Sequence, residues 1–171
     1  MDKKMLTEFV IQKINERGVA LEQIAELTHF LQSSYYPDLT LEMCLENVEA
    51  VLKKREVQNA ILTGIRLDEL AELKLLEGPL QEMVEGDYSL YGIDEILALS
   101  ILNIYGSIGF TNYGYIDKLK PGILGELDVK GKSKENNCQT FMDDLVGAVA
   151  AAAASRIAHR RAGDEEESVL I

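Results

Sequence analysis

Three groups of acidic residues lie in the least charged half of the sequence: Asp94-Glu95, Asp117 and Asp143-Asp144. The residues around them, from 90 to 154, are otherwise mostly apolar, small or aromatic. Carboxylates in such surroundings are costly to bury unless something pairs with them. A divalent metal ion with oxygen ligands would account for all of them together, and carboxylate ligands favour Mg²⁺ or Mn²⁺ over Zn²⁺. The pattern therefore indicates a candidate metal site.

The same acids also have a simpler structural explanation. Asp94-Glu95 and Asp143-Asp144 stand in the opening turns of predicted helices, where acidic side chains complement the helix dipole. Thr140, three residues before Asp143, fits a capping box. Capping does not account for Asp144, nor for Asp117, which lies in a segment rich in glycine and tyrosine. Both interpretations stay open at the level of the sequence.

Length and composition predict a single all-helical domain. A chain of 171 residues is long enough to bury a sizeable core, and it has three prolines and no tryptophan. The net charge of -12 argues against binding to nucleic acid and against electrostatic docking onto an anionic bilayer. The two cysteines, Cys44 and Cys138, match neither a disulfide framework nor a metal motif, which favours reduced thiols in the cytoplasm.

The sequence contains no convincing membrane span. The longest stretch without charged residues, 96–116, carries asparagines, serines, tyrosines and glycines and is too polar. The apolar stretch 145–155 has about half the length that a bilayer core requires. We therefore expect a soluble cytoplasmic protein with at most peripheral contact with the membrane. Apolar stripes on its helices would also suit a homodimer.

The apolar periodicity predicts a helical bundle over residues 1–162. Amphipathic helices are expected at 6–16, 20–32, 41–52 and 56–76, with Gly64 as a potential break in the last. A helix that is apolar nearly all round, and so buried on most sides, is expected over 93–108. Glycine-rich 121–137 is expected to form a mobile surface loop, and 163–171 an acidic frayed tail. Alanines on the last helix, 140–162, would let neighbouring helices approach closely, which predicts a central apolar helix ringed by amphipathic ones.

The acidic groups belong to three short motifs that together resemble a known family. The motifs are Ile93-Asp94-Glu95-Ile96, Asp117-Lys118-Leu119-Lys120-Pro121 and Met142-Asp143-Asp144-Leu145-Val146-Gly147. In order and spacing they resemble phosphatidylglycerophosphatase A, and are closest to its soluble branch in Gram-positive bacteria, sometimes called low-temperature-requirement protein C. In that family the acids are thought to bind Mg²⁺ and support hydrolysis of a phosphate monoester. The resemblance therefore implies a magnesium-dependent phosphatase.

The resemblance also implies a role for each residue. Asp94, Glu95, Asp143 and Asp144 would hold one or two Mg²⁺ or Mn²⁺ ions. Asp117 would orient the attacking water or act as general base, with Asp144 beside it in the catalytic set. Lys120 would neutralise the developing phosphate charge. The weaker candidates for binding the substrate phosphate are Lys120, Arg55 and Arg156. The substrate would be a phosphate monoester, such as phosphatidylglycerophosphate or another phospholipid headgroup.

The chain departs from the family pattern at its N-terminal half and near the middle motif. The glycine-rich signature with a Pro-Gly-Thr step has no clear counterpart, and 60–64 is a poor substitute. The arginine expected three residues before Asp117 is Gly114 here, which removes a candidate phosphate ligand. These departures favour the alternative class, a non-catalytic module that binds metal or phosphate, or mediates helical interactions, and keeps the family fold.

Basic residues are concentrated in a few places of this acidic chain, including Lys53-Lys54-Arg55 and the segment 156–161. A solvated helix face and compensation of the helix dipole explain them most simply. The alternative is that Arg156 and Arg160, one helical turn apart, receive a phosphate or an acidic partner.

Overall fold

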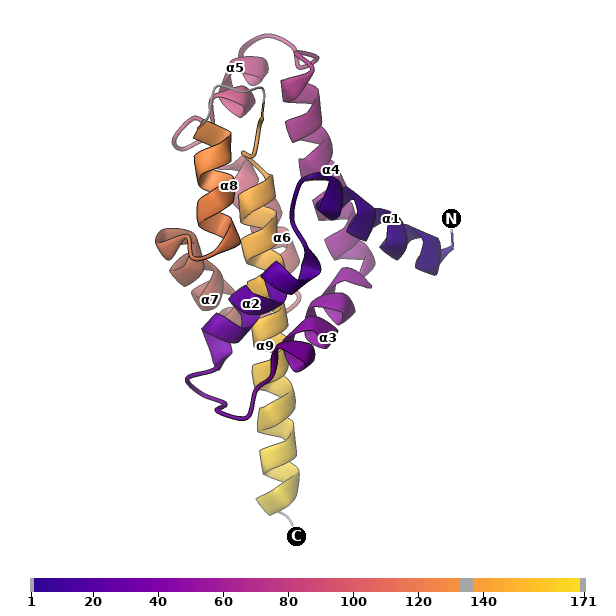
Figure 1. The fold of residues 1–171 in the computed structure, drawn as a ribbon, viewed down its shortest axis with the longest axis vertical. Coiled ribbons are helices and arrows are strands. Elements are labelled where there is room, and N and C mark those ends of the chain that lie inside the picture. The colour runs from indigo at the N-terminus through magenta and orange to yellow at the C-terminus, as the bar shows by residue number, and fades with distance from the viewer. Residues whose placement is uncertain (1, 133–136, 170–171) are drawn as a thin grey trace.

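The computed structural model describes residues 2–132 and 137–169 of the chain (Figure 1). This part is all-helical, as predicted, and contains no strand. The helices are α1 (Lys3–Glu16), α2 (Leu21–Gln32), α3 (Leu41–Leu52), α4 (Arg55–Glu72), α5 (Pro79–Glu85), α6 (Ile93–Leu102), α7 (Gly106–Leu119), α8 (Ile123–Lys132) and α9 (Met142–Val169).

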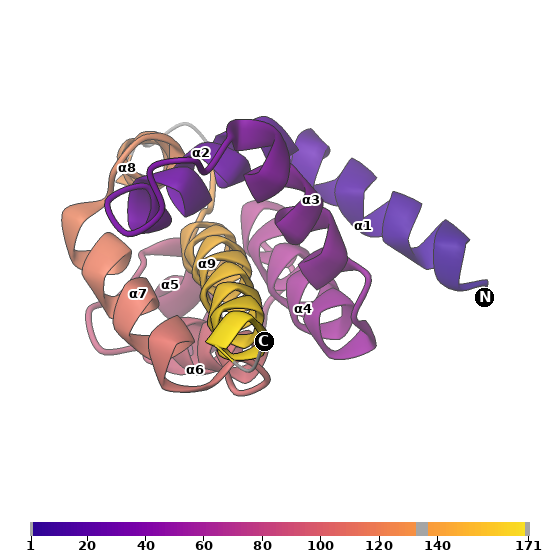
Figure 2. The ribbon, with the colours of Figure 1, turned by 90° about the horizontal axis from the view of Figure 1, so that it is seen from below.

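Helix α9 lies at the centre of the bundle, and Figure 2 shows it end-on with most of the other helices around it. It contacts α2, α3, α4, α6, α7 and α8. Ala148 and the run Ala150–Ala154 are each 0% exposed. Because helices pack closer together when the side chains between them are small, these alanines let several neighbours meet one helix. The prediction of a central, small-residue helix is confirmed.

The helices of the N-terminal half follow the apolar period closely. The bounds of α3 are those expected, and α2 differs from its expected range by one residue. Helix α4 runs unbroken through Gly64, contrary to the suggested break. Gly64 instead lies against Phe141 and Leu145, so the missing side chain serves the close approach of α4 and α9.

The expected helix over 93–108 is in fact two helices. Helix α6 ends at Leu102, and α7 begins at Gly106, whose φ of 72° turns the chain between them. Helix α6 is not buried on most sides, because Ile93 and Ile96 are 52% and 61% exposed. Gly109 and Gly114 lie within α7 and do not interrupt it.

The segment expected as a surface loop, 121–137, contains helix α8. Ile123, Leu124 and Leu127 give this helix a buried face, at most 3% exposed. Residues 133–136 of that segment lie outside the described residues. At the other end of the chain, α9 continues past 162 as far as Val169, through residues expected to form a frayed tail.

No helix within 2–132 and 137–169 is both long and apolar enough to cross a bilayer. The uncharged stretch 96–116 is divided between α6 and α7, and 145–155 lies in α9 at the centre of the bundle.

Candidate functional site

The first turn of α9 carries the acidic pair Asp143-Asp144. Asp144 is 6% exposed, and its Oδ1 accepts a hydrogen bond of 2.8 Å from the Tyr113 hydroxyl of α7. Burial and the neighbouring charge of Asp143 raise the pKa of Asp144 to about 8, against the opposing effect of the Tyr113 hydrogen bond. Asp144 is therefore a carboxyl group that can take up or release a proton near neutral pH.

Lys120 joins the middle acidic group to the last. Its Nζ donates to Asp117 Oδ1 and to Asp143 Oδ2, both at 2.7 Å. Lys120 caps the C-terminus of α7 in the left-handed conformation, with a φ of 47°, immediately before Pro121. Burial lowers the pKa of Lys120, but the charges and hydrogen bonds of Asp143 and Asp117 outweigh it, so that the pKa lies above its ordinary value. The side chain is therefore a fixed cation between two carboxylates.

Asp94 and Glu95 begin α6 at the same end of the molecule as this cluster. Tyr91, just before α6, packs edge-on against Phe141, just before α9, with 5.9 Å between ring centroids. Asp94 is buried, and its Oδ1 accepts from the Glu95 backbone N–H at 2.9 Å, which is a helix-start contact. The side chain of Glu95 is exposed. These two acids thus lie near the end of the bundle where Asp143 lies, with Asp94 partly engaged in its own helix.

The acidic residues offer the right donors for a divalent cation, because carboxylate oxygens are what Mg²⁺ and Mn²⁺ prefer. The charges of Asp117, Asp143 and Asp144 all raise the pKa of the Tyr113 hydroxyl, so these three acids lie in its neighbourhood. In the described ranges, however, no three His, Cys, Asp or Glu side chains are grouped so that they could hold one metal ion. The position between Asp117 and Asp143 is taken by the Lys120 ammonium.

Two of the three candidate phosphate ligands lie away from the acidic cluster. Twelve positions of α9 separate Asp144 from Arg156, about 18 Å along the helix axis. Arg55 follows Lys54, whose Nζ lies 5.7 Å from the Tyr105 ring centroid, and the Tyr105 carbonyl accepts from Ser155 Oγ. Arg55 therefore lies toward the Arg156 end of α9, and of the three only Lys120 is brought to the acids.

The sequence matches the family model described as Phosphatidylglycerophosphatase A over residues 10–159, most of the chain. The chain belongs to the phosphatidylglycerophosphatase A family. The resemblance drawn from the three acidic motifs, including its low-temperature-requirement branch in Gram-positive bacteria, is confirmed.

Relatives of this phosphatidylglycerophosphatase A family member occur in several bacteria. The uncharacterized protein YutG of Bacillus subtilis is 64% identical, over 86% of this chain and 87% of its own. The low temperature requirement C protein of Listeria monocytogenes has a solved structure that is 58% identical with a TM-score of 0.87, covering 91% of this chain and 96% of that one. The structure of ypjQ from Bacillus subtilis is 52% identical with a TM-score of 0.89, covering 95% and 99%.

One departure from the phosphatidylglycerophosphatase A pattern is not imposed by packing. Gly114 lies within α7 on the exposed side, and a Cβ added there would meet nothing within 4 Å. A larger side chain would therefore fit at this position. The loss of arginine here leaves Lys120 as the basic residue that contacts Asp117 and Asp143.

The start of α9 is held by a residue that the sequence analysis missed, Asp68 of α4. Asp68 Oδ1 and Oδ2 accept from the backbone N–H of Phe141 at 3.1 and 3.2 Å, and Oδ2 accepts from that of Met142 at 3.1 Å. The hydroxyl of Thr140, the expected capping residue, donates to the carbonyl of Val84 at 2.6 Å. A carboxylate distant in the sequence thus fixes the helix that presents the acidic pair.

Asp68 is 0% exposed, and burial raises its pKa to about 8, with the backbone hydrogen bonds and the charge of Arg17 opposing the rise. A signal for it does exist in the sequence. Asp68 follows Ile61 and Ile65 at helical spacing on the buried face of α4. An acidic residue in an apolar stripe marks a buried carboxylate that needs partners.

Proposed function

We propose that this protein is a Mg²⁺-dependent phosphatase that hydrolyses a phosphate monoester, with phosphatidylglycerophosphate as the substrate that its family favours. The observation that carries the proposal is the cluster at the start of α9. There a buried Asp144, with a pKa of about 8, adjoins Asp143, which shares the Lys120 ammonium with Asp117. Membership of the phosphatidylglycerophosphatase A family supports it independently.

Asp143 and Asp144 are the carboxylates that would hold Mg²⁺ or Mn²⁺ together with water, and Asp94 and Glu95 are further candidate ligands at this end of the bundle. The bound ion would polarise the phosphate and lower the pKa of a water molecule. A cation here would also favour the charged form of Asp144, which burial and Asp143 disfavour.

The remaining chemistry falls to side chains of this chain. Asp117 is partly exposed and would accept a proton from the attacking water while its hydrogen bond orients that water. Lys120 would donate to the phosphate oxygens, where negative charge develops. Tyr113 would hold the Asp144 carboxylate in place through the bond that it already makes.

The test is phosphate release from phosphatidylglycerophosphate in detergent micelles, with Mg²⁺ or with EDTA, for wild type, Asp144→Asn and Asp38→Asn. Asp38 is an exposed aspartate bonded to Arg161 and is the matched control. We expect Mg²⁺-dependent release that falls by about 100-fold or more in Asp144→Asn. Asp38→Asn should keep the wild-type rate.

A second candidate function is a non-catalytic module that binds metal or phosphate. The observation that favours it is that Lys120 already occupies the position between Asp117 and Asp143. Mg²⁺ binding measured by calorimetry, without release of phosphate from any ester tried, would select this function. Absence of turnover, of Mg²⁺ binding and of phosphate binding would contradict both candidates.

A further inference from the structure

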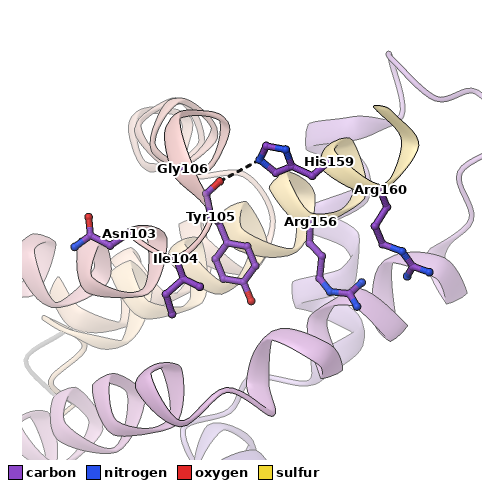
Figure 3. Close-up of a pocket in the computed structure, with 7 residues that line it drawn as sticks. All are labelled: Asn103, Ile104, Tyr105, Gly106, Arg156, His159 and Arg160. Carbon is purple, nitrogen blue, oxygen red and sulfur yellow. Dashed lines mark hydrogen bonds between the residues drawn. The ribbon is translucent and has the colours of Figure 1, made fainter. Parts of the chain in front are cut away.

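A second candidate site lies where the turn between α6 and α7 meets the later part of α9. A pocket of about 570 Å³ opens there, within the range of small-molecule sites. It is lined by residues 103–106 of the turn and by Arg156, His159 and Arg160 of α9 (Figure 3). About 18 Å of α9 separate Arg156 from Asp144, so no small ligand can touch both places.

The pocket is basic in a protein whose net charge is -12. Arg156 and Arg160 stand one turn apart on α9, and neither forms an ion pair with a carboxylate of the described part of the chain. Arg156 Nη1 donates to the side-chain oxygen of Asn47, a neutral amide that positions the guanidinium without neutralising it. The pocket therefore keeps two positive charges available.

Tyr105 adds a hydrogen-bonding group that lacks a partner. Its side chain lines the pocket and is 8% exposed, yet its hydroxyl bonds to none of the described groups. The contact with His159 Nε2, at 3.4 Å, is made by the Tyr105 backbone carbonyl. Burying a hydroxyl without a hydrogen-bond partner is unfavourable. A ligand in the pocket would supply the missing partner.

The groups that face Tyr105 are mostly cationic. Lys54 Nζ lies over its ring, 5.7 Å from the centroid. The charge of Arg156 lowers the pKa of the Tyr105 hydroxyl, and the charge of Glu56, at the start of α4, raises it. The excess of positive charge around Tyr105 favours an anion with several acceptor oxygens as the ligand.

We propose that this pocket binds a phosphate group, carried either by a small phosphate ester or by a lipid headgroup. The planar guanidinium groups of Arg156 and Arg160 can each donate two parallel hydrogen bonds to phosphate oxygens. The Tyr105 hydroxyl donates to a third acceptor. The site is separate from the acidic cluster and needs no divalent metal, so it stands whether or not the protein is a phosphatase.

The test measures binding of glycerol 3-phosphate by calorimetry, in EDTA and at constant ionic strength. The variants are Arg160→Gln, the double variant Arg156→Gln/Arg160→Gln, and Tyr105→Phe. The matched control is Arg66→Gln, an exposed arginine of α4 that pairs with Glu69. We expect the double variant to weaken binding at least about tenfold and Arg160→Gln several-fold, with Arg66→Gln unchanged.

A second arm identifies the source of the phosphate. Sedimentation with phosphatidylcholine vesicles, with and without phosphatidic acid, reports binding to a headgroup. Binding of glycerol 3-phosphate that depends on the arginines identifies a small phosphate ester as the ligand. Binding to vesicles with phosphatidic acid, without binding of glycerol 3-phosphate, identifies a lipid headgroup.

Three results would overturn the proposal. One is that neither probe binds the wild-type protein. Another is that Arg160→Gln, which replaces an exposed side chain, binds both probes as wild type does. The last is that Asp144→Asn abolishes binding in EDTA, which would place the phosphate at the acidic cluster.

Discussion

Replacing Gly64 by alanine tests how tightly α4 is pressed against α9. A methyl group at this position would lie 2.6 Å from Leu145 Cδ1 and 3.2 Å from Leu97 Cδ2, both ends of flexible side chains that can rotate away. It would also lie 3.0 Å from Phe141 Cβ. That atom moves only with the backbone at the start of α9. We therefore predict that Gly64→Ala destabilises the protein.

The size of the effect follows from two opposing terms. Overpacking a well-filled core costs about 1–3 kcal/mol. Alanine in place of glycine inside a helix stabilises the folded state by about 0.5–1 kcal/mol. Gly114→Ala is the matched control, because it lies inside α7 and its added methyl group meets nothing within 4 Å. The control should be more stable than wild type, and the difference between the two variants isolates the steric cost.

Urea denaturation followed by circular dichroism gives both free energies of unfolding, provided that the slopes agree among the variants. We expect the free energy of unfolding of Gly114→Ala to exceed that of Gly64→Ala by about 1–3 kcal/mol. A difference below about 0.5 kcal/mol would refute the argument, because it would show that α4 can move off α9 at little cost.

Three further predictions concern the carboxyl groups around the start of α9. Asp68→Ala should lower the free energy of unfolding by about 2–4 kcal/mol, because the Phe141 and Met142 amides lose their acceptor; a loss below about 1 kcal/mol in urea denaturation would contradict this. Tyr113→Phe removes a hydrogen bond that lowers the pKa of Asp144. The pKa of Asp144 should therefore rise by about one unit in a carboxyl NMR titration of this variant. An unchanged pKa would show that the hydrogen bond is not made. The pKa of Asp144 in the folded protein, about 8, lies above its ordinary value of 3.8. Between these two pH values the folded state keeps a proton that the unfolded state has released. The free energy of unfolding therefore falls as the pH rises through this window. In EDTA, wild type should therefore lose more stability than Asp144→Asn between about pH 5 and about pH 8, and an equal or smaller loss would contradict the raised pKa.

The N-terminal helices were predictable because each presents one apolar face to the core and a polar face to solvent. Helix α8 was not predictable, because its few apolar residues are interspersed with glycines and charged residues. Gly125 shows why composition misled: a Cβ there would lie 2.8 Å from the Lys120 carbonyl oxygen. This glycine lies where two backbone segments approach closely. In the sequence, it cannot be distinguished from a glycine in a loop.

The sequence could also place acids in the first turns of two helices, since helix starts have local signals. It could not show that Lys120 reaches Asp143, 23 positions further along the chain, or that Asp68 bonds to amides more than 70 positions away. Such contacts depend on how the helices pack. The resemblance to a family supplied the grouping that local patterns could not.

The central position of α9 has a consequence for synthesis on the ribosome. Helices α1 to α8 emerge first, yet the surface that most of them cover is the alanine-lined face of the helix that comes after them. At roughly 5–20 residues per second, α2, the first helix that contacts α9, waits on the order of ten seconds or more for that partner. During this time the earlier helices expose apolar faces to the solvent. Nascent chains of this protein should therefore depend on chaperones until the last helix has left the exit tunnel, and folding should complete in one late, cooperative step.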